Sequence, residues 1–182
     1  WVPSSSWLDY LDGNRDQFPE QALRGEMETV RRKMEGIRND HSSPDTRMSD
    51  DTLRYNPAIN SCLTQLMMGG ITPRYGEPLH CRLRYFDPER RRAGVPEDVA
   101  TLVEKMDAET TEVTIVNTNP VDARTVTVQA GAYAEHQIGE VRAGELNAAV
   151  SGPSFDVHLE PGAGARFHLT LDRYVNQPTF DF

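Results

Sequence analysis

Short runs of alternating apolar and polar residues in the second half of the chain constrain its fold most strongly. The β-branched runs EVTIVN (112–117) and RTVTVQ (124–129) are separated by TNPVDA, a segment of turn-forming residues. Apolar residues alternate with polar ones again at Phe155, Val157, Leu159, Phe167, Leu169 and Leu171. Short strands of this period, separated by turns such as PGAGA, are typical of an antiparallel β-sandwich. We expect residues 132–138 and 79–86 to add strands to the same sheet system.

The first part of the chain has a helical pattern instead. Between residues 20 and 39, apolar side chains recur at intervals of four and three, which places them in one stripe on a helix. The stripe consists of Leu23, Met27, Val30, Met34 and Ile37. We expect this amphipathic helix to dock on a neighbouring element. A second helix is predicted from Pro57 to the pair Gly69-Gly70, and a third, short helix over residues 96–106.

Together these patterns predict an α+β fold in which N-terminal helices and a long loop pack on a C-terminal antiparallel β-sandwich. The predicted boundary separates a helical and loop-rich region, residues 1–78, from the sandwich, residues 79–182, which includes the short helix at 96–106. A length of 182 residues suits one domain, or one domain with a substantial appendage.

Composition argues against several classes of function. The formal net charge is -9 and the isoelectric point is near 5.0, so repulsion opposes binding to nucleic acid or to an anionic membrane surface. The sequence has no run of 18 apolar residues, so we expect no segment to span a membrane. Cys62 and Cys81 have no CxxC spacing and belong to no cluster of cysteines and histidines, so a zinc site is not expected. We therefore expect no metal and no cofactor.

The segment 40–56 is a polar loop with candidate chemistry. His41, Asp45, Asp50 and Asp51 could hold a divalent cation or act in acid–base catalysis. The aspartates lack the central glycine and the final glutamate of an EF-hand. The alternative interpretation is a loop whose aspartates form Asx turns.

The N-terminus is rich in aromatic residues. Trp1, Trp7 and Tyr10 could stack on sugar rings and so form a small glycan-binding surface. The alternative is that these rings anchor the N-terminal segment to the body of the protein. Further along, Glu135 and His136 are adjacent in a predicted strand, so they face opposite sides and cannot act as a pair.

Five arginines occur within HCRLRYFDPERRRAG, residues 80–94. Arg82 and Arg84 share one face of the predicted strand, whereas residues 90–92 follow a turn and point in different directions. The run therefore cannot hold one anion as a unit. We expect ion pairs here at the junction of the two regions, with Arg84 as a candidate binding residue. Contact with an acidic partner surface is the alternative.

Three stretches carry a resemblance to known proteins. They are LRYFDPERRRAGVPEDVATLVEKM (83–106), VNTNPVDARTVTVQAGAYAEHQI (116–138) and LEPGAGARFHLTLDRYVNQPT (159–179). Residues 79–182 resemble the C-terminal region of large uncharacterised bacterial proteins and are loosely similar to the C-terminal β-sandwich domains of glycoside hydrolases. The resemblance implies a sandwich fold and transfers no catalytic residue.

These observations favour a non-catalytic structural or interaction domain. We expect it to be the terminal part of a larger bacterial protein, plausibly a carbohydrate-active enzyme, and its first partner to be the remainder of that protein. The chain begins at Trp1 rather than at methionine, which fits an excised piece. The alternatives are a contribution of the 40–56 loop to a hydrolase active site, or a glycan-binding module that uses carbohydrate as its partner.

Overall fold

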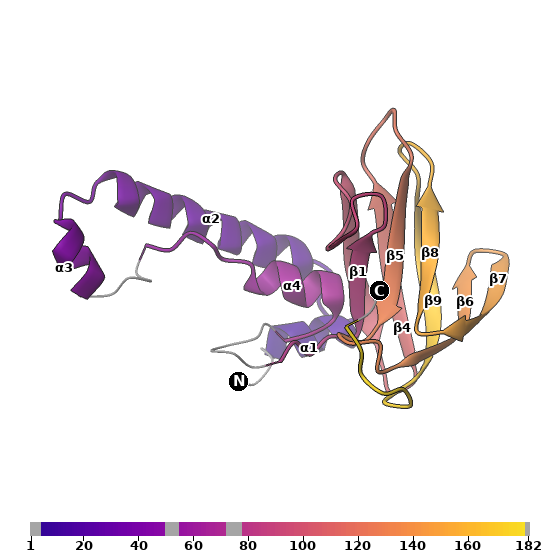
Figure 1. The fold of residues 1–182 in the computed structure, drawn as a ribbon. Helices are drawn as coiled ribbons and strands as arrows, with labels where there is room; N and C mark the ends of the chain where they lie inside the picture. The colour runs from indigo at the N-terminus through magenta and orange to yellow at the C-terminus, as the bar shows by residue number, and fades with distance from the viewer. Residues whose placement is uncertain (1–4, 50–54, 72–77, 181–182) are drawn as a thin grey trace.

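A computed structural model describes residues 5–49, 55–71 and 78–180 of the chain. The described part contains four helices followed by nine strands, and the predicted α+β class is confirmed. Figure 1 shows two parts: a sandwich of strands, and a set of helices that projects away from it.

The strands form two antiparallel sheets. One sheet has the order β2-β1-β5-β8 and the other β3-β4-β9-β6-β7. The strands are β1 (Leu83–Asp87), β2 (Arg92–Ala93), β3 (Val99–Met106), β4 (Thr110–Asn117), β5 (Arg124–Ala130), β6 (Gln137–Ala143), β7 (Leu146–Gly152), β8 (Ser154–Leu159) and β9 (Gly164–Asp172).

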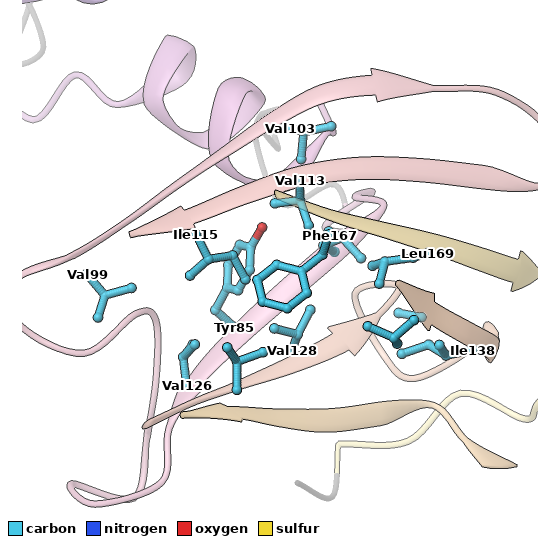
Figure 2. Close-up of a cluster of buried hydrophobic side chains, with 14 of the residues drawn as sticks. Tyr85, Val99, Val103, Val113, Ile115, Val126, Val128, Ile138, Phe167 and Leu169 are labelled. Atoms are coloured by element: carbon cyan, nitrogen blue, oxygen red, sulfur yellow. The ribbon is translucent and has the colours of Figure 1, made fainter. Parts of the chain in front are cut away.

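The core of the sandwich lies between the two sheets. Burial alternates along β4, so that Val113 and Ile115 point inward and are fully buried. Figure 2 shows them facing Val126 and Val128 of β5 across the core. Burying a side chain of this size stabilises a fold by ~1.5–3 kcal/mol, so the alternation seen in the sequence is the main driving force for this packing.

The prediction of a short helix at 96–106 was wrong, because residues 99–106 form strand β3. The apolar residues Val99 and Val103 fit a helical stripe, but Thr101 between them is also buried, which is the period of a strand. β3 pairs with β4 along its whole length, with a bulge between Val103 and Lys105. This long-range pairing decides the conformation of a segment whose local pattern was ambiguous.

Two turns were also misplaced. Residues 132–136, part of the predicted strand at 132–138, form a turn that precedes β6, and the segment AVSGP at 149–153, whose glycine and proline indicate a turn, is largely the end of β7. β7 is an edge strand with mostly exposed side chains, so it lacks the buried alternation that would mark it in the sequence.

The helices are α1 (Ser5–Leu11), α2 (Phe18–Arg38), α3 (Pro44–Ser49) and α4 (Ser61–Met68). The predicted loop at 40–56 therefore contains a short helix, and the helix predicted from Pro57 begins at Ser61 instead. α1 and α4 lie against the sandwich, whereas α2 extends outward and α3 lies at its outer end (Figure 1). None of the described helices is long and apolar enough to cross a membrane.

The C-terminal end of α4 is attached to the sandwich through its backbone carbonyls. The Tyr85 hydroxyl donates to the Met67 carbonyl at 2.7 Å, and the Arg82 amide donates to the Met68 carbonyl at 2.9 Å. Gly69 ends the helix in the left-handed conformation that favours glycine. At Gly70 the chain passes so close to the His80 carbonyl and to Cys81 that a β-carbon would overlap them. These contacts fix the position of α4.

Candidate functional site

The helical arm, which we define as α2 and α3, leaves most of its apolar stripe exposed. None of the 21 residues of α2 is buried. Leu23, near its N-terminal end, packs on the cluster around Trp7, but Met27 is 53% exposed and Ile37 is 44% exposed. Docking through the apolar stripe therefore holds only for the N-terminal part of α2.

A different side of α2 is in contact with the returning chain. The Glu26 carboxylate accepts hydrogen bonds from the Cys62 and Leu63 amides at 3.0 and 3.2 Å, at the start of α4. Ten residues along α2, Gly36 leaves room for the ring of Tyr55. Glu26 thus supplies acceptors for amides that have no partner within α4. This contact lies beside the apolar stripe and does not cover Met27, Met34 or Ile37.

Arginines line the edge of the exposed stripe that lies away from Glu26 and Gly36. Arg24, Arg31 and Arg38 recur every seven residues, so they share one side of the helix. Arg24 is paired with Glu20 at 2.6 Å, whereas no carboxylate in the described part of the chain forms an ion pair with Arg31 or Arg38. Met27 and Met34 each follow one of these arginines by three residues, which makes them neighbours on the helix surface.

The outer end of the arm holds the candidates from the 40–56 loop. His41 is exposed, and Asp45 is exposed in the first turn of α3. Asp50 and Asp51 lie outside the described residues. Nearby, Arg47 pairs with Asp40 and lies over the Tyr55 ring, 4.7 Å from its centre. Among the described residues no group of three or more histidine, cysteine or carboxylate side chains could hold a metal. A catalytic role for this segment stays a prediction.

The predicted aromatic site is largely internal. Trp7 and Tyr10 are 3% and 8% exposed and pack with Phe18 and Leu66, while Trp1 lies outside the described residues. Burial, with a smaller contribution from Glu104, raises the pKa of Tyr10 to about 12. The rings of Trp7 and Tyr10 therefore anchor α1, and almost all of their surface is covered by the protein.

A cavity of about 260 Å³ lies where the helices meet the sandwich, and we call it the junction cavity. α1 contributes apolar residues to the lining, and residues 69–71 and 80–82 line the cavity as well. Its lining residues are Trp7, Leu8, Leu11, Gly69, Gly70, Ile71, His80, Cys81, Arg82, Met106, Glu135, His136, Arg173 and Tyr174.

Two arginines line this cavity. Arg82 donates one hydrogen bond, from Nη2 to the Asp107 carbonyl at 2.8 Å, and its buried Nη1 has no partner among the described residues. Burial and the neighbouring charge of Arg173 lower the pKa of Arg82. The candidate Arg84 lies elsewhere: it donates to the Ala132 carbonyl at 2.8 Å and lies over the Phe86 ring. No ion pair of Arg84 joins the two regions in the described part of the chain.

His136 and Glu135 form a rigid side of the cavity. The Glu135 carboxylate accepts hydrogen bonds from the Ala132 and Tyr133 amides, at 3.2 and 2.7 Å. The Tyr174 amide donates to His136 Nδ1 at 3.1 Å, and Glu135 Oε1 lies 4.0 Å from His136 Nε2. Burial lowers the pKa of His136, and Arg173 and Arg82 add to this effect while Glu135 opposes it. His136 is therefore held as a neutral hydrogen-bond acceptor.

Comparison with known proteins links the helical part to a family. A model described as a domain of unknown function (DUF8034) matches residues 3–64, a segment that includes all of α1, α2 and α3 and the start of α4. No curated protein and no solved structure matches the chain. The comparisons give no link to glycoside hydrolases or to large bacterial proteins.

Sequence reasoning missed the grouping of Arg82, His136 and Arg173. These residues come from three separate segments, and no local spacing relates them. The one available signal was that Arg82 alternates with apolar residues in HCRLRY, and that pattern is common on strands.

Proposed function

We propose that this chain is a non-catalytic interaction module of a larger protein, in which the sandwich is the fixed body and the helical arm binds a partner. The observation that carries the proposal is the apolar stripe of α2, which extends from the sandwich with Met27, Met34 and Ile37 exposed. Isolated exposed apolar residues are ordinary, but a row on a projecting helix is typical of a protein-binding surface.

The charges beside the stripe indicate the chemistry of the partner. Arg24, Arg31 and Arg38 border it in a chain whose net charge is -9. A second copy of α2 packed antiparallel would bring this arginine edge against its own equivalent, and like charges oppose that pairing. An amphipathic helix with carboxylates beside its apolar residues would bury the methionines and pair with the arginines.

The family match supports the same division of the chain. The matched residues 3–64 cover the whole helical arm and none of the strands. A segment that recurs in other proteins and includes the exposed stripe is a reasonable carrier of the binding function, whereas the sandwich supports it here.

The test uses a labelled synthetic helix with leucines at intervals of three and four and glutamates beside them. We expect it to bind the chain in a fluorescence-anisotropy titration, and the same peptide with lysines in place of glutamates to bind far more weakly. Met34→Glu should weaken binding roughly tenfold or more, since a buried apolar side chain contributes ~1.5–3 kcal/mol. Gln21→Glu, which places the same charge on the opposite side of α2, is the matched control.

Sedimentation of the free chain completes the design. A monomer that binds the acidic peptide through Met34 supports the proposal. Failure of the acidic peptide to bind, equal binding of both peptides, or equal effects of Met34→Glu and Gln21→Glu would each contradict it. A stable dimer broken by Met34→Glu would show that a second copy covers the stripe, and this would also contradict the choice of partner.

A further inference from the structure

The junction cavity is lined by two guanidinium groups, of which Arg82 feels the charge of Asp107 without a direct ion pair. Neither Arg82 nor Arg173 forms an ion pair with a carboxylate in the described part of the chain, although the chain has 28 acidic residues. The guanidinium of Arg173 lies beside the exposed ring of Tyr174, 5.2 Å from its centre, and Nη2 is 3.4 Å from the Tyr174 hydroxyl. Both arginines line the cavity.

The nearby carboxylates are occupied elsewhere. Asp107 offers Arg82 its carbonyl, while its carboxylate accepts hydrogen bonds from the Thr110 amide and hydroxyl and from the Glu109 amide, in the turn between β3 and β4. Glu135 is held by two amides of the 131–136 turn. The guanidinium of Arg82 is thus half-buried with one carbonyl as its acceptor, and Asp107 compensates its charge only at a distance, so a further acceptor on the cavity side would stabilise it.

We propose that the junction cavity binds a small organic carboxylate, with its oxygens paired to Arg82 and Arg173 and its apolar part against Trp7 and Leu11. A planar carboxylate matches the fork of donors on a guanidinium. The apolar side formed by α1 gives the rest of the molecule a surface to cover. His136, neutral and already accepting the Tyr174 amide, shapes the cavity without adding charge.

The volume of the cavity sets the size of the ligand. About 260 Å³ lies just below the range of ~300–1,000 Å³ that is usual for drug-sized ligands. A single-ring or short-chain acid fits this space, whereas an extended peptide or an oligosaccharide does not. The inference is independent of the proposed role of the arm, because Arg82 and Arg173 belong to the sandwich.

Benzoate is the probe, and benzamide is its uncharged control of nearly the same shape. Because Trp7 lines the cavity, its fluorescence in a Trp1→Phe background reports occupancy. We expect benzoate to change this fluorescence saturably and to raise the melting temperature, and benzamide to do neither. Arg82→Met and Arg173→Met should each weaken benzoate binding by roughly tenfold, the scale of a lost charged hydrogen bond. Arg142→Met, on β6 and outside the cavity lining, should bind as the parent chain does.

The stability of Arg82→Met separates a binding role from a structural one. Removing a half-buried charge that forms no direct ion pair should leave the melting temperature unchanged or raise it. No saturable benzoate signal, equal signals for benzoate and benzamide, or unchanged binding in both arginine variants would overturn the proposal. A larger effect of inorganic phosphate than of benzoate would overturn the assignment to carboxylates. If Arg82→Met fails to fold, the exposed Arg173→Met still decides the matter.

Discussion

Tyr85→Phe tests how the sandwich holds α4. The Tyr85 side chain is 2% exposed, and its hydroxyl donates to the Met67 carbonyl in the last turn of the helix. The substitution keeps the buried ring and removes only this donor. A buried acceptor left without its donor costs ~1–3 kcal/mol, and each kcal/mol lowers the melting temperature of a domain of 150–250 residues by ~2–4 °C. We therefore expect a fall of roughly 2–12 °C.

The assay is thermal unfolding followed by circular dichroism, together with amide hydrogen exchange. Amides of α4 should exchange faster in Tyr85→Phe, whereas those of the central strand β4 should keep their protection relative to global unfolding. Tyr174→Phe is the control, because that side chain is 66% exposed and should change stability by less than ~0.5 kcal/mol. If both variants melt within about 1 °C of the parent chain, the Met67 carbonyl does not depend on Tyr85 and the reasoning is refuted.

Three further predictions concern the junction between the helices and the sandwich. Gly70→Ala should lower the melting temperature by several degrees, since the added β-carbon overlaps the facing backbone. Gly25→Ala, in open space on α2, should be neutral or stabilise the fold by up to ~1 kcal/mol. Equal effects of the two substitutions would contradict the close approach of Gly70 to the His80 carbonyl and Cys81. Burial lowers the pKa of His136 from 6.5, so below pH 6.5 the unfolded chain binds more protons than the folded one. Denaturant titrations should therefore show that the stability of the parent chain falls on acidification, and that it falls less steeply in His136→Asn. Parallel pH profiles of the two proteins would show that His136 is not responsible. Burial raises the pKa of the Cys81 thiol to about 12, so iodoacetamide should modify the less buried Cys62 first. Mass spectrometry of digests would show the order of modification, and the reverse order would contradict the burial of Cys81.

Much of the sandwich could be predicted because its strands are specified locally. In β8 and β9 every second residue is apolar, as are Val113 and Ile115 in β4 and Val126 and Val128 in β5, and this period both identifies a strand and selects the side that is buried. The segment of β3 shows the limit of this reasoning. Its apolar residues fit either period, and only pairing with β4 resolves the ambiguity.

The stripe of α2 shows a second limit. Its period correctly predicts a helix, but amphipathicity does not say whether the apolar face is covered within the same chain. Here the chain contacts the neighbouring side through Glu26 and Gly36, two residues that carry no hydrophobic signal. The junction cavity is harder still, since Arg82, His136 and Arg173 meet only after the strands have paired.

The segment that the family model matches is not self-sufficient in this chain. Trp7 and Tyr10 become buried by packing with Leu66, and that cluster is completed by Leu102 and Met106 of β3. Leu66 and the Met67 and Met68 carbonyls, which receive hydrogen bonds from the sandwich, follow residue 64, where the match ends. The matched segment therefore carries the exposed stripe, while the sandwich determines where that stripe points. Because α2 has no buried residue, only packing at its start, as by Leu23, and side contacts such as that of Glu26 hold it, so its orientation depends on how firmly α1 and α4 are fixed to the sandwich.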